Sequence, residues 1–161
     1  MITQYRKLYL IVENYSKTSS DISLLKQKRK YFVGNVTLRD ISSKIEMHDQ
    51  KVYLAGFRNG ARTKLHYHQG DQTLVITKGK GVLVLYKKIS SKKGILRIKP
   101  VSKTRLKQGD IVLIPKHTLH WHWAIQKNNF MHIALNAFYP GKESKPIWFE
   151  SDFVSSASRL Y

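Results

Sequence analysis

Short apolar runs alternate with turn residues along most of the chain. From Tyr31 onward, runs rich in Val, Ile, Leu and Tyr recur, and Gly, Pro, Asn or Asp separate them. This pattern predicts short β-strands joined by turns, which is typical of a β-sandwich or a β-barrel. We therefore expect an all-β domain over residues 31–140. The predicted strands are Tyr31–Leu38, Lys51–Phe57, Lys64–His68, Thr73–Thr77, Val82–Lys87, Ile95–Ile98, Ile111–Ile114, His120–Ile125 and Phe130–Phe138.

The two ends of the chain follow a different pattern. Ser19-Ser20-Asp21 is typical of the N-cap of a short helix over Ile22–Arg29. We interpret residues 1–30 as an N-terminal extension that packs on the main domain. Residues 141–161 are interpreted as a C-terminal tail, in which the amphipathic segment Trp148–Tyr161 predicts a second short helix.

The charge balance changes the picture of the surface. The chain has 29 Lys and Arg against 10 Asp and Glu, which gives a formal net charge of +19. Such a field favours anionic partners, but no known nucleic-acid-reading motif is present, so we expect only nonspecific contact with nucleic acid. Residues 87–107 hold nine Lys or Arg and no acid. We interpret them as a projecting basic hairpin with a solvated tip, and the alternative is a docking arm for an anionic polymer.

Two absences narrow the chemistry and the location. The chain has no cysteine, so disulfides, thiolate zinc sites and cysteine nucleophiles are excluded, and any metal must be held by nitrogen and oxygen. The longest apolar run, Leu8–Val12, is too short to span a bilayer. We therefore expect a cytoplasmic protein that does not associate with membranes.

Six of the seven histidines lie between residues 66 and 132, and five of these six lie in three of the predicted strands. His66 and His68 are two residues apart, as are His120 and His122, so each pair projects from one face of its strand. The carboxamide of Gln72, at the start of the next strand, can reach the same point. Neutral imidazoles are common ligands of first-row divalent metals. The spacing therefore predicts a metal site.

Two segments of the chain resemble a known family. The segment from Gly60 to Gln72 is similar to the first cupin motif, with Gln72 in place of the usual Glu. The segment from Gly109 to His120 resembles the second motif, with His117 in place of a Gly, the residue that favours a positive φ. The resemblance implies a small jelly-roll (cupin) barrel that forms a homodimer and holds one metal ion. It also implies the ligands, which are His66, His68, Gln72 and His120.

A narrower similarity concerns the cupins that include bacterial manganese-dependent hydroxynitrile lyases. It implies manganese or iron as the metal, with zinc, nickel or cobalt as alternatives. It also places His122 and His132 beside the metal as general acid or base, although His132 taken alone is more typical of a buried structural residue. Arg62 or Lys64 could bind the carboxylate of a substrate, with plain surface charge as the alternative. The segments that carry this similarity are Ala61-Arg62-Thr63, Gln72, His120-Trp121-His122 and Met131-His132.

Three functions from different classes fit these residues. The first is a metal-dependent lyase or isomerase for a small carbonyl- or hydroxyl-bearing substrate. In it, a metal with only neutral ligands acts as a strong Lewis acid and a histidine moves the proton. The second is an iron-dependent dioxygenase, which would consume oxygen. The third is a non-enzymatic module that binds or senses a small anion. The first is favoured because His122 and His132 suit proton transfer.

Overall fold

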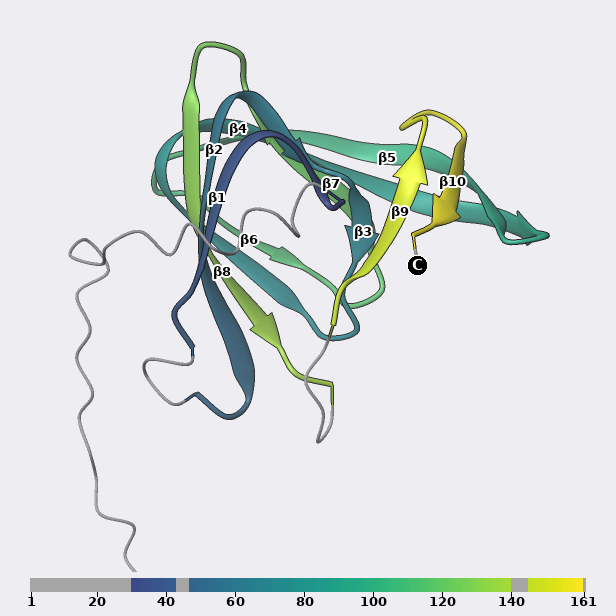
Figure 1. Cartoon of the computed structure of the whole chain (residues 1–161), viewed down its shortest axis with the longest axis horizontal. Helices are drawn as coiled ribbons and strands as arrows, with labels where there is room; N and C mark the ends of the chain where they lie inside the picture. Colours follow the sequence, from purple (N-terminus) through teal and green to yellow (C-terminus); the bar gives the residue numbers. More distant parts are fainter. Residues whose placement is uncertain (1–29, 43–46, 140–144, 161) are drawn as a thin grey trace, which may run out of the picture.

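The computed structural model describes residues 30–42, 47–139 and 145–160. Those residues form ten β-strands and no helix (Figure 1), so the predicted all-β class is confirmed. Within them, no helix is available that could cross a membrane. The strands are β1 (Phe32–Asp40), β2 (Gln50–Thr63), β3 (Leu65–Tyr67), β4 (Gln72–Lys92), β5 (Ile95–Lys107), β6 (Ile111–Ile114), β7 (Leu119–Ala124), β8 (Asn129–Ala137), β9 (Ile147–Ser151) and β10 (Ser156–Arg159).

The strands close into two adjacent rings that share β4 and β7. In the first ring, β2 and β4 each pair with both β7 and β8, so the ladder returns to its start. In the second ring, β3, β9, β10 and β5 connect β7 back to β4. Strands β1 and β6 extend the sheet from β2 and β4. Closure pairs the backbone hydrogen-bonding groups at the strand edges, and it leaves the interior of the first ring available for a binding site.

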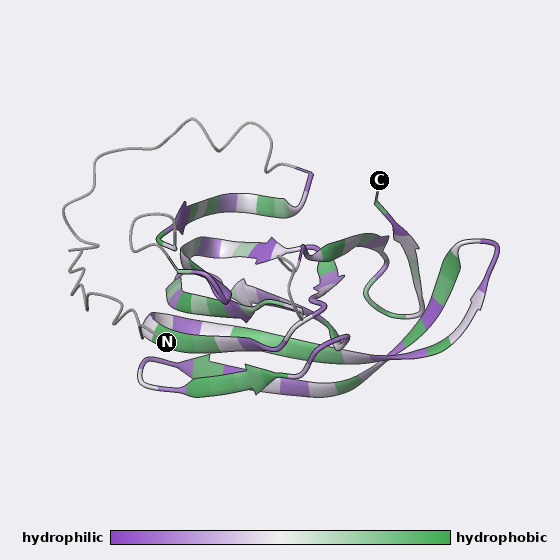
Figure 2. Ribbon diagram, turned by 90° about the horizontal axis from the view of Figure 1, so that it is seen from below, coloured by the Kyte–Doolittle hydropathy of each residue, from purple (hydrophilic) through white to green (hydrophobic). Residues whose placement is uncertain are grey.

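Alternating side chains along the shared strands fill both rings. On β7, His120 and His122 point into the first ring, whereas Trp121 and Trp123 point into the second. Figure 2 shows this alternation of hydrophobic and hydrophilic residues along the strands. The first core is centred on Phe57, Leu74, Ile76, Leu83 and Phe130. The second core is centred on Leu65, Val82, Val84, Tyr86, Ile98 and Phe149.

The C-terminal segment is a strand pair, so the helix predicted over Trp148–Tyr161 is wrong. Phe149 on β9 lies opposite Leu65 on β3 and is 5% exposed. The apolar positions of this segment therefore follow the period of a strand that covers the second core. The helix predicted over Ile22–Arg29 lies outside the described residues.

Strands β4 and β5 form a long antiparallel hairpin that extends past the rings (Figure 1). The hairpin turns at Lys93-Gly94, where both residues have a positive φ. Within the segment interpreted as a basic hairpin, residues 87–99 lie in its outer part, whereas Pro100–Lys107 pair with Lys80–Tyr86, the part of β4 next to β7. All nine Lys and Arg residues of this segment are exposed.

Two residues with a left-handed φ shape the backbone, one within β4 and one in the loop before β7. Gly79 has a φ of 77°, and a Cβ there would lie 1.7 Å from the carbonyl oxygen of Asn129, so only glycine fits. His117, which replaces a glycine of the cupin motif, has a φ of 61°. Its backbone N–H donates to the carbonyl oxygen of His68 at 2.8 Å. The loop before β7 thus keeps a left-handed residue and is tied to the end of β3.

Candidate metal centre

A cavity of about 320 Å³, large enough for a small organic molecule, lies against the first ring and is also lined by residues of β1, β3 and β9. Aromatic side chains make much of its wall, and Lys51 and Lys145 also line it, while no acidic side chain of the residues that the structure describes does. The polar residues of the lining include His66, His68, Gln72, His122, His132 and Asn136.

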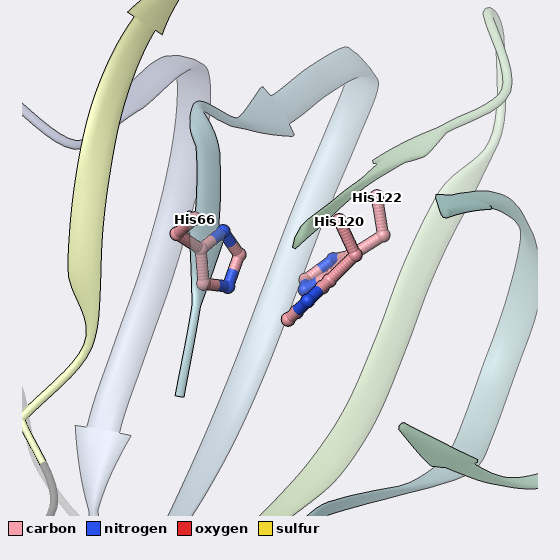
Figure 3. A group of neighbouring side chains, drawn as sticks. All are labelled: His66, His120 and His122. Atoms are coloured by element: carbon pink, nitrogen blue, oxygen red, sulfur yellow. The ribbon is translucent and has the colours of Figure 1, made fainter. Parts of the chain in front are cut away.

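Three imidazoles converge from two neighbouring strands (Figure 3). His66 on β3 lies opposite His120 on β7, and their ring centroids are 4.2 Å apart. One ring nitrogen of each of His66, His120 and His122 lies within 4.8 Å of the other two. All three side chains are buried, with exposed fractions of 2%, 0% and 4%. This triad could bind a divalent metal ion.

Backbone carbonyls select the tautomer of two of these rings. The Nδ1 of His66 lies 2.9 Å from the carbonyl oxygen of Lys64, and the Nδ1 of His120 lies 2.8 Å from that of Thr118. Because a carbonyl can only accept, each Nδ1 must carry the proton and donate it. The Nε2 of both rings is then left with a free lone pair, which is the form that binds a metal.

The carboxamide of Gln72 joins His68 and His120 to one cluster. Its Nε2 donates to Oδ1 of Asn136 at 2.8 Å and lies 3.0 Å from Nε2 of His68. Its Oε1 lies 3.1 Å from Nε2 of His120. Asn136, which the sequence did not single out, therefore fixes the orientation of the Gln72 amide.

The spacing of two of these atoms suits a metal ion. Oε1 of Gln72 and the deprotonated Nε2 of His120 each present a lone pair, and two such atoms repel when nothing positive lies between them. Neighbouring donors around an octahedral ion with ligand distances of about 2.1 Å are about 3 Å apart. The donor set of this chain therefore fits a divalent metal.

Burial keeps all the imidazoles of the cavity neutral. Desolvation lowers the pKa of His68 to about 3 and that of His120 to about 4. Desolvation, followed by repulsion from the neighbouring imidazoles, lowers the pKa of His66 and His122 well below the ordinary value. Neutral rings offer lone pairs to a cation at physiological pH.

His132 lies next to the triad but outside it. Its ring stacks on Phe57, with centroids 5.6 Å apart, and meets His122 edge to face at 5.0 Å. Burial lowers its pKa to about 3. The Nδ1 atoms of His122 and His132 are buried and have no hydrogen-bond partner. His132 therefore offers a neutral ring nitrogen beside the candidate ligands.

The sequence did not point to Trp148, which holds His66 in place. Trp148 lies opposite His66 in the β3–β9 pairing, and the two rings stack with centroids 4.2 Å apart. Tyr31 stacks on the same indole at 4.9 Å. Trp148 lies in the tail, outside both cupin motifs. Because the tail was predicted as a helix, the pairing of Trp148 with His66 on β3 could not be predicted.

The two cations predicted to bind substrate do not line the cavity. The guanidinium of Arg62 lies over Phe153 and Trp121, at 4.4 and 5.6 Å from their ring centroids, on the side of the second ring. Lys64 forms an ion pair with Glu150. Strand pairing explains the position of Arg62, because Arg62 lies opposite Trp123, which points into the second ring. Lys51 and Lys145 are instead the cations of the cavity lining.

Comparisons with known proteins agree with this geometry. The family model for cupins matches residues 50–153, and the chain belongs to the cupin family. A cupin-like protein from Thermotoga maritima is 30% identical, with 89% of this chain and 90% of that chain covered and a TM-score of 0.58. The predicted cupin barrel is therefore confirmed.

More distant structures share the fold alone. A cupin 2 conserved barrel domain protein from Rhodopseudomonas palustris is 15% identical, with a TM-score of 0.54 over 73% of this chain and 68% of that chain. Vicilin from Corylus avellana is 18% identical, with a TM-score of 0.55 over 71% of this chain and 33% of that chain. No curated protein matches this chain. The similarity to the hydroxynitrile lyase subgroup is not confirmed.

Proposed function

We propose that this cupin is a metal-dependent lyase or isomerase, acting in the first ring on a small substrate that carries a carbonyl or hydroxyl group. The observation that carries the proposal is the cluster of buried, neutral imidazoles around Gln72. It lines a cavity together with a further imidazole, His132, whose Nδ1 has no partner. Such a cavity combines candidate metal ligands with a separate group that can accept a proton.

The proposed ligands are His66, His68, Gln72 and His120. Two observations support this set: the Nε2 lone pairs of His66 and His120, and the contact of the Gln72 amide with ring nitrogens of both His68 and His120. An alternative set keeps His66 and His120 and adds His122, the third member of the triad. Manganese or iron is the proposed metal, and with four neutral ligands it would supply a strong Lewis acid that stabilises an oxyanion.

The proposed role of His132 is general base. In a cleavage of the hydroxynitrile-lyase type, its imidazole takes the hydroxyl proton of the substrate. The bond between the carbinol carbon and the nitrile carbon then breaks, a carbonyl forms, and cyanide leaves and is protonated. A buried imidazole with a pKa of about 3 is a weak base. The negative charge that develops on the substrate oxygen as the proton leaves stabilises the imidazolium beside it and raises that pKa.

The lining of the cavity favours a small anionic or polar substrate with an apolar body. Phe32, Phe57 and Trp148 offer aromatic walls, and Lys51 and Lys145 are the positive charges of the lining. Lys51 also forms an ion pair with Asp40 at 3.7 Å. We therefore propose Lys145, in place of Arg62 and Lys64, as the residue that attracts an anionic group.

A panel of cyanohydrins and hydroxy acids, assayed with manganese or Fe(II) and with an oxygen electrode, tests the proposal. Turnover that a chelator abolishes, with no oxygen uptake, is expected. His132→Gln should retain the metal and lose most of the rate, and His48→Gln, at an exposed position, should behave as the wild type. Oxygen consumption coupled to turnover would instead indicate a dioxygenase. Tight binding of a small anion without turnover would indicate a binding module.

A further inference from the structure

A surface outside the cavity combines basic and aromatic side chains in register. Lys80 lies opposite Lys107, Arg105 opposite Val82, and Lys103 opposite Val84 along the β4–β5 pairing. Val82 and Val84 in turn lie opposite Trp123 and Trp121 on β7. Residues directly opposite one another in antiparallel strands share a face. We call the resulting group of Lys80, Lys103, Arg105, Lys107 and Trp123 the basic–aromatic face.

The charged groups of this face are turned to solvent and have no acid among them. All four of its Lys and Arg residues are exposed, while Val82 and Val84 beneath them are only 4% and 5% exposed. Long Lys and Arg side chains can cover apolar residues with their stems and still present their charges to water. The chain has no Asp or Glu between residues 72 and 109. Asp110, at the end of this segment, accepts a hydrogen bond from the backbone N–H of Lys107.

Aromatic rings lie beside these charges. Trp121 and Trp123 stack on each other, with centroids 4.2 Å apart and an angle of 12° between the planes. The ammonium of Lys103 lies 5.7 Å from the ring of Trp123, and Arg62 lies over Trp121 on the other side of the pair. Trp123 is partly exposed. Proteins that bind single-stranded nucleic acid without sequence preference combine a row of positive charges with aromatic rings on which the bases stack.

We propose that the basic–aromatic face binds single-stranded nucleic acid without sequence preference. Lys80, Lys103, Arg105 and Lys107 contact successive phosphates, and the indole of Trp123 offers a surface on which a base stacks. The interaction is charge-driven and independent of the metal centre, because these side chains lie on the face of β4 and β5 that carries Val82 and Val84 of the second core, and none of them is among the residues that line the cavity.

Fluorescence anisotropy with a labelled oligothymidylate, titrated with the full chain at increasing salt, tests this proposal. The double variant Lys103→Gln/Arg105→Gln should lose about two phosphate contacts. The slope of log K against log salt should then become shallower by about 1.4, and binding at 0.1 M salt should be about 25-fold weaker. Quenching of tryptophan fluorescence on titration with the wild type should accompany binding.

A matched control separates this face from the net charge of the hairpin. Lys87 and Lys99 lie opposite each other on β4 and β5. They point away from the face of Tyr86 and Ile98, which contribute to the second core. Lys87→Gln/Lys99→Gln removes the same charge, and we expect it to retain most of the affinity. Equal losses in both double variants, absence of binding, or tighter binding to a duplex of the same sequence would each overturn the proposal.

Discussion

Acid should unfold the metal-free protein, because the cavity buries neutral imidazoles that must become charged at low pH. His68 and His132 have a pKa of about 3 in the folded chain and His120 of about 4, against an ordinary value of 6.5. Between these limits the unfolded chain binds more protons than the folded one. The free energy of unfolding is therefore insensitive to these groups above pH 6.5, and it falls as the pH drops towards 4.

The magnitude follows from the same values. Lowering the pH from 7 to 5 should cost about 2 kcal/mol for each of the three imidazoles, or about 6 kcal/mol together. That sum is comparable with the whole stability of a typical domain, about 5–15 kcal/mol. His66 and His122, whose pKa is lowered even further, act in the same direction.

Urea unfolding of the chelator-treated protein, followed by tryptophan fluorescence between pH 7 and pH 4, measures this dependence. The free energy of unfolding should fall by at least about 4 kcal/mol per pH unit between pH 6 and 5, the linkage of three protons. His132→Gln should reduce that slope by about one proton. A wild-type slope of one proton or less, or an unchanged slope in His132→Gln, would refute the reasoning.

Substitutions at four further positions test separate parts of the structure. His68→Ala should release the metal and His122→Ala should retain it, as measured by elemental analysis; the reverse result would favour the triad as the ligand set. Trp148→Ala should weaken metal affinity about tenfold by freeing the ring of His66, while Trp148→Phe keeps most of it; equal affinities in a competition titration would contradict this role. Tyr86 donates to the carbonyl oxygen of Phe153 at 2.8 Å and accepts from Nε1 of Trp121 at 3.0 Å. Tyr86→Phe should therefore lower the free energy of unfolding by about 1–3 kcal/mol; a change below about 0.5 kcal/mol would contradict the estimate.

The strand pattern and the two motifs predicted much of this architecture. Strand alternation places His66, His120 and His122 on one side of β3 and β7. The structure keeps this alternation because each strand buries one face in the first ring and the opposite face in the second ring. The histidine spacing also indicated a shared site, since the β3–β7 pairing brings two of the three segments into contact. The jelly-roll barrel followed from the resemblance, and the family match confirms it.

Other features depend on contacts that local sequence does not encode. The tail was predicted as a helix from an amphipathic segment that is too short to distinguish a helix from a strand. It forms strands because β9 pairs with β3 and β10 pairs with β5. Arg62 was expected as one of two residues that could bind the carboxylate of a substrate. Its direction, however, depends on the pairing of β2 with β7 through Trp123. His117 shows that a non-glycine residue can hold a left-handed φ when its N–H is anchored to His68.

Elemental analysis of the protein purified without added metal tests the central claim most directly. We expect about one manganese or iron ion per chain in the wild type and none in His120→Ala, with both proteins giving the same far-UV circular dichroism spectrum. A metal-free wild type that takes up no divalent ion on dialysis, or a His120→Ala variant that retains its full content, would contradict a metal centre in the first ring.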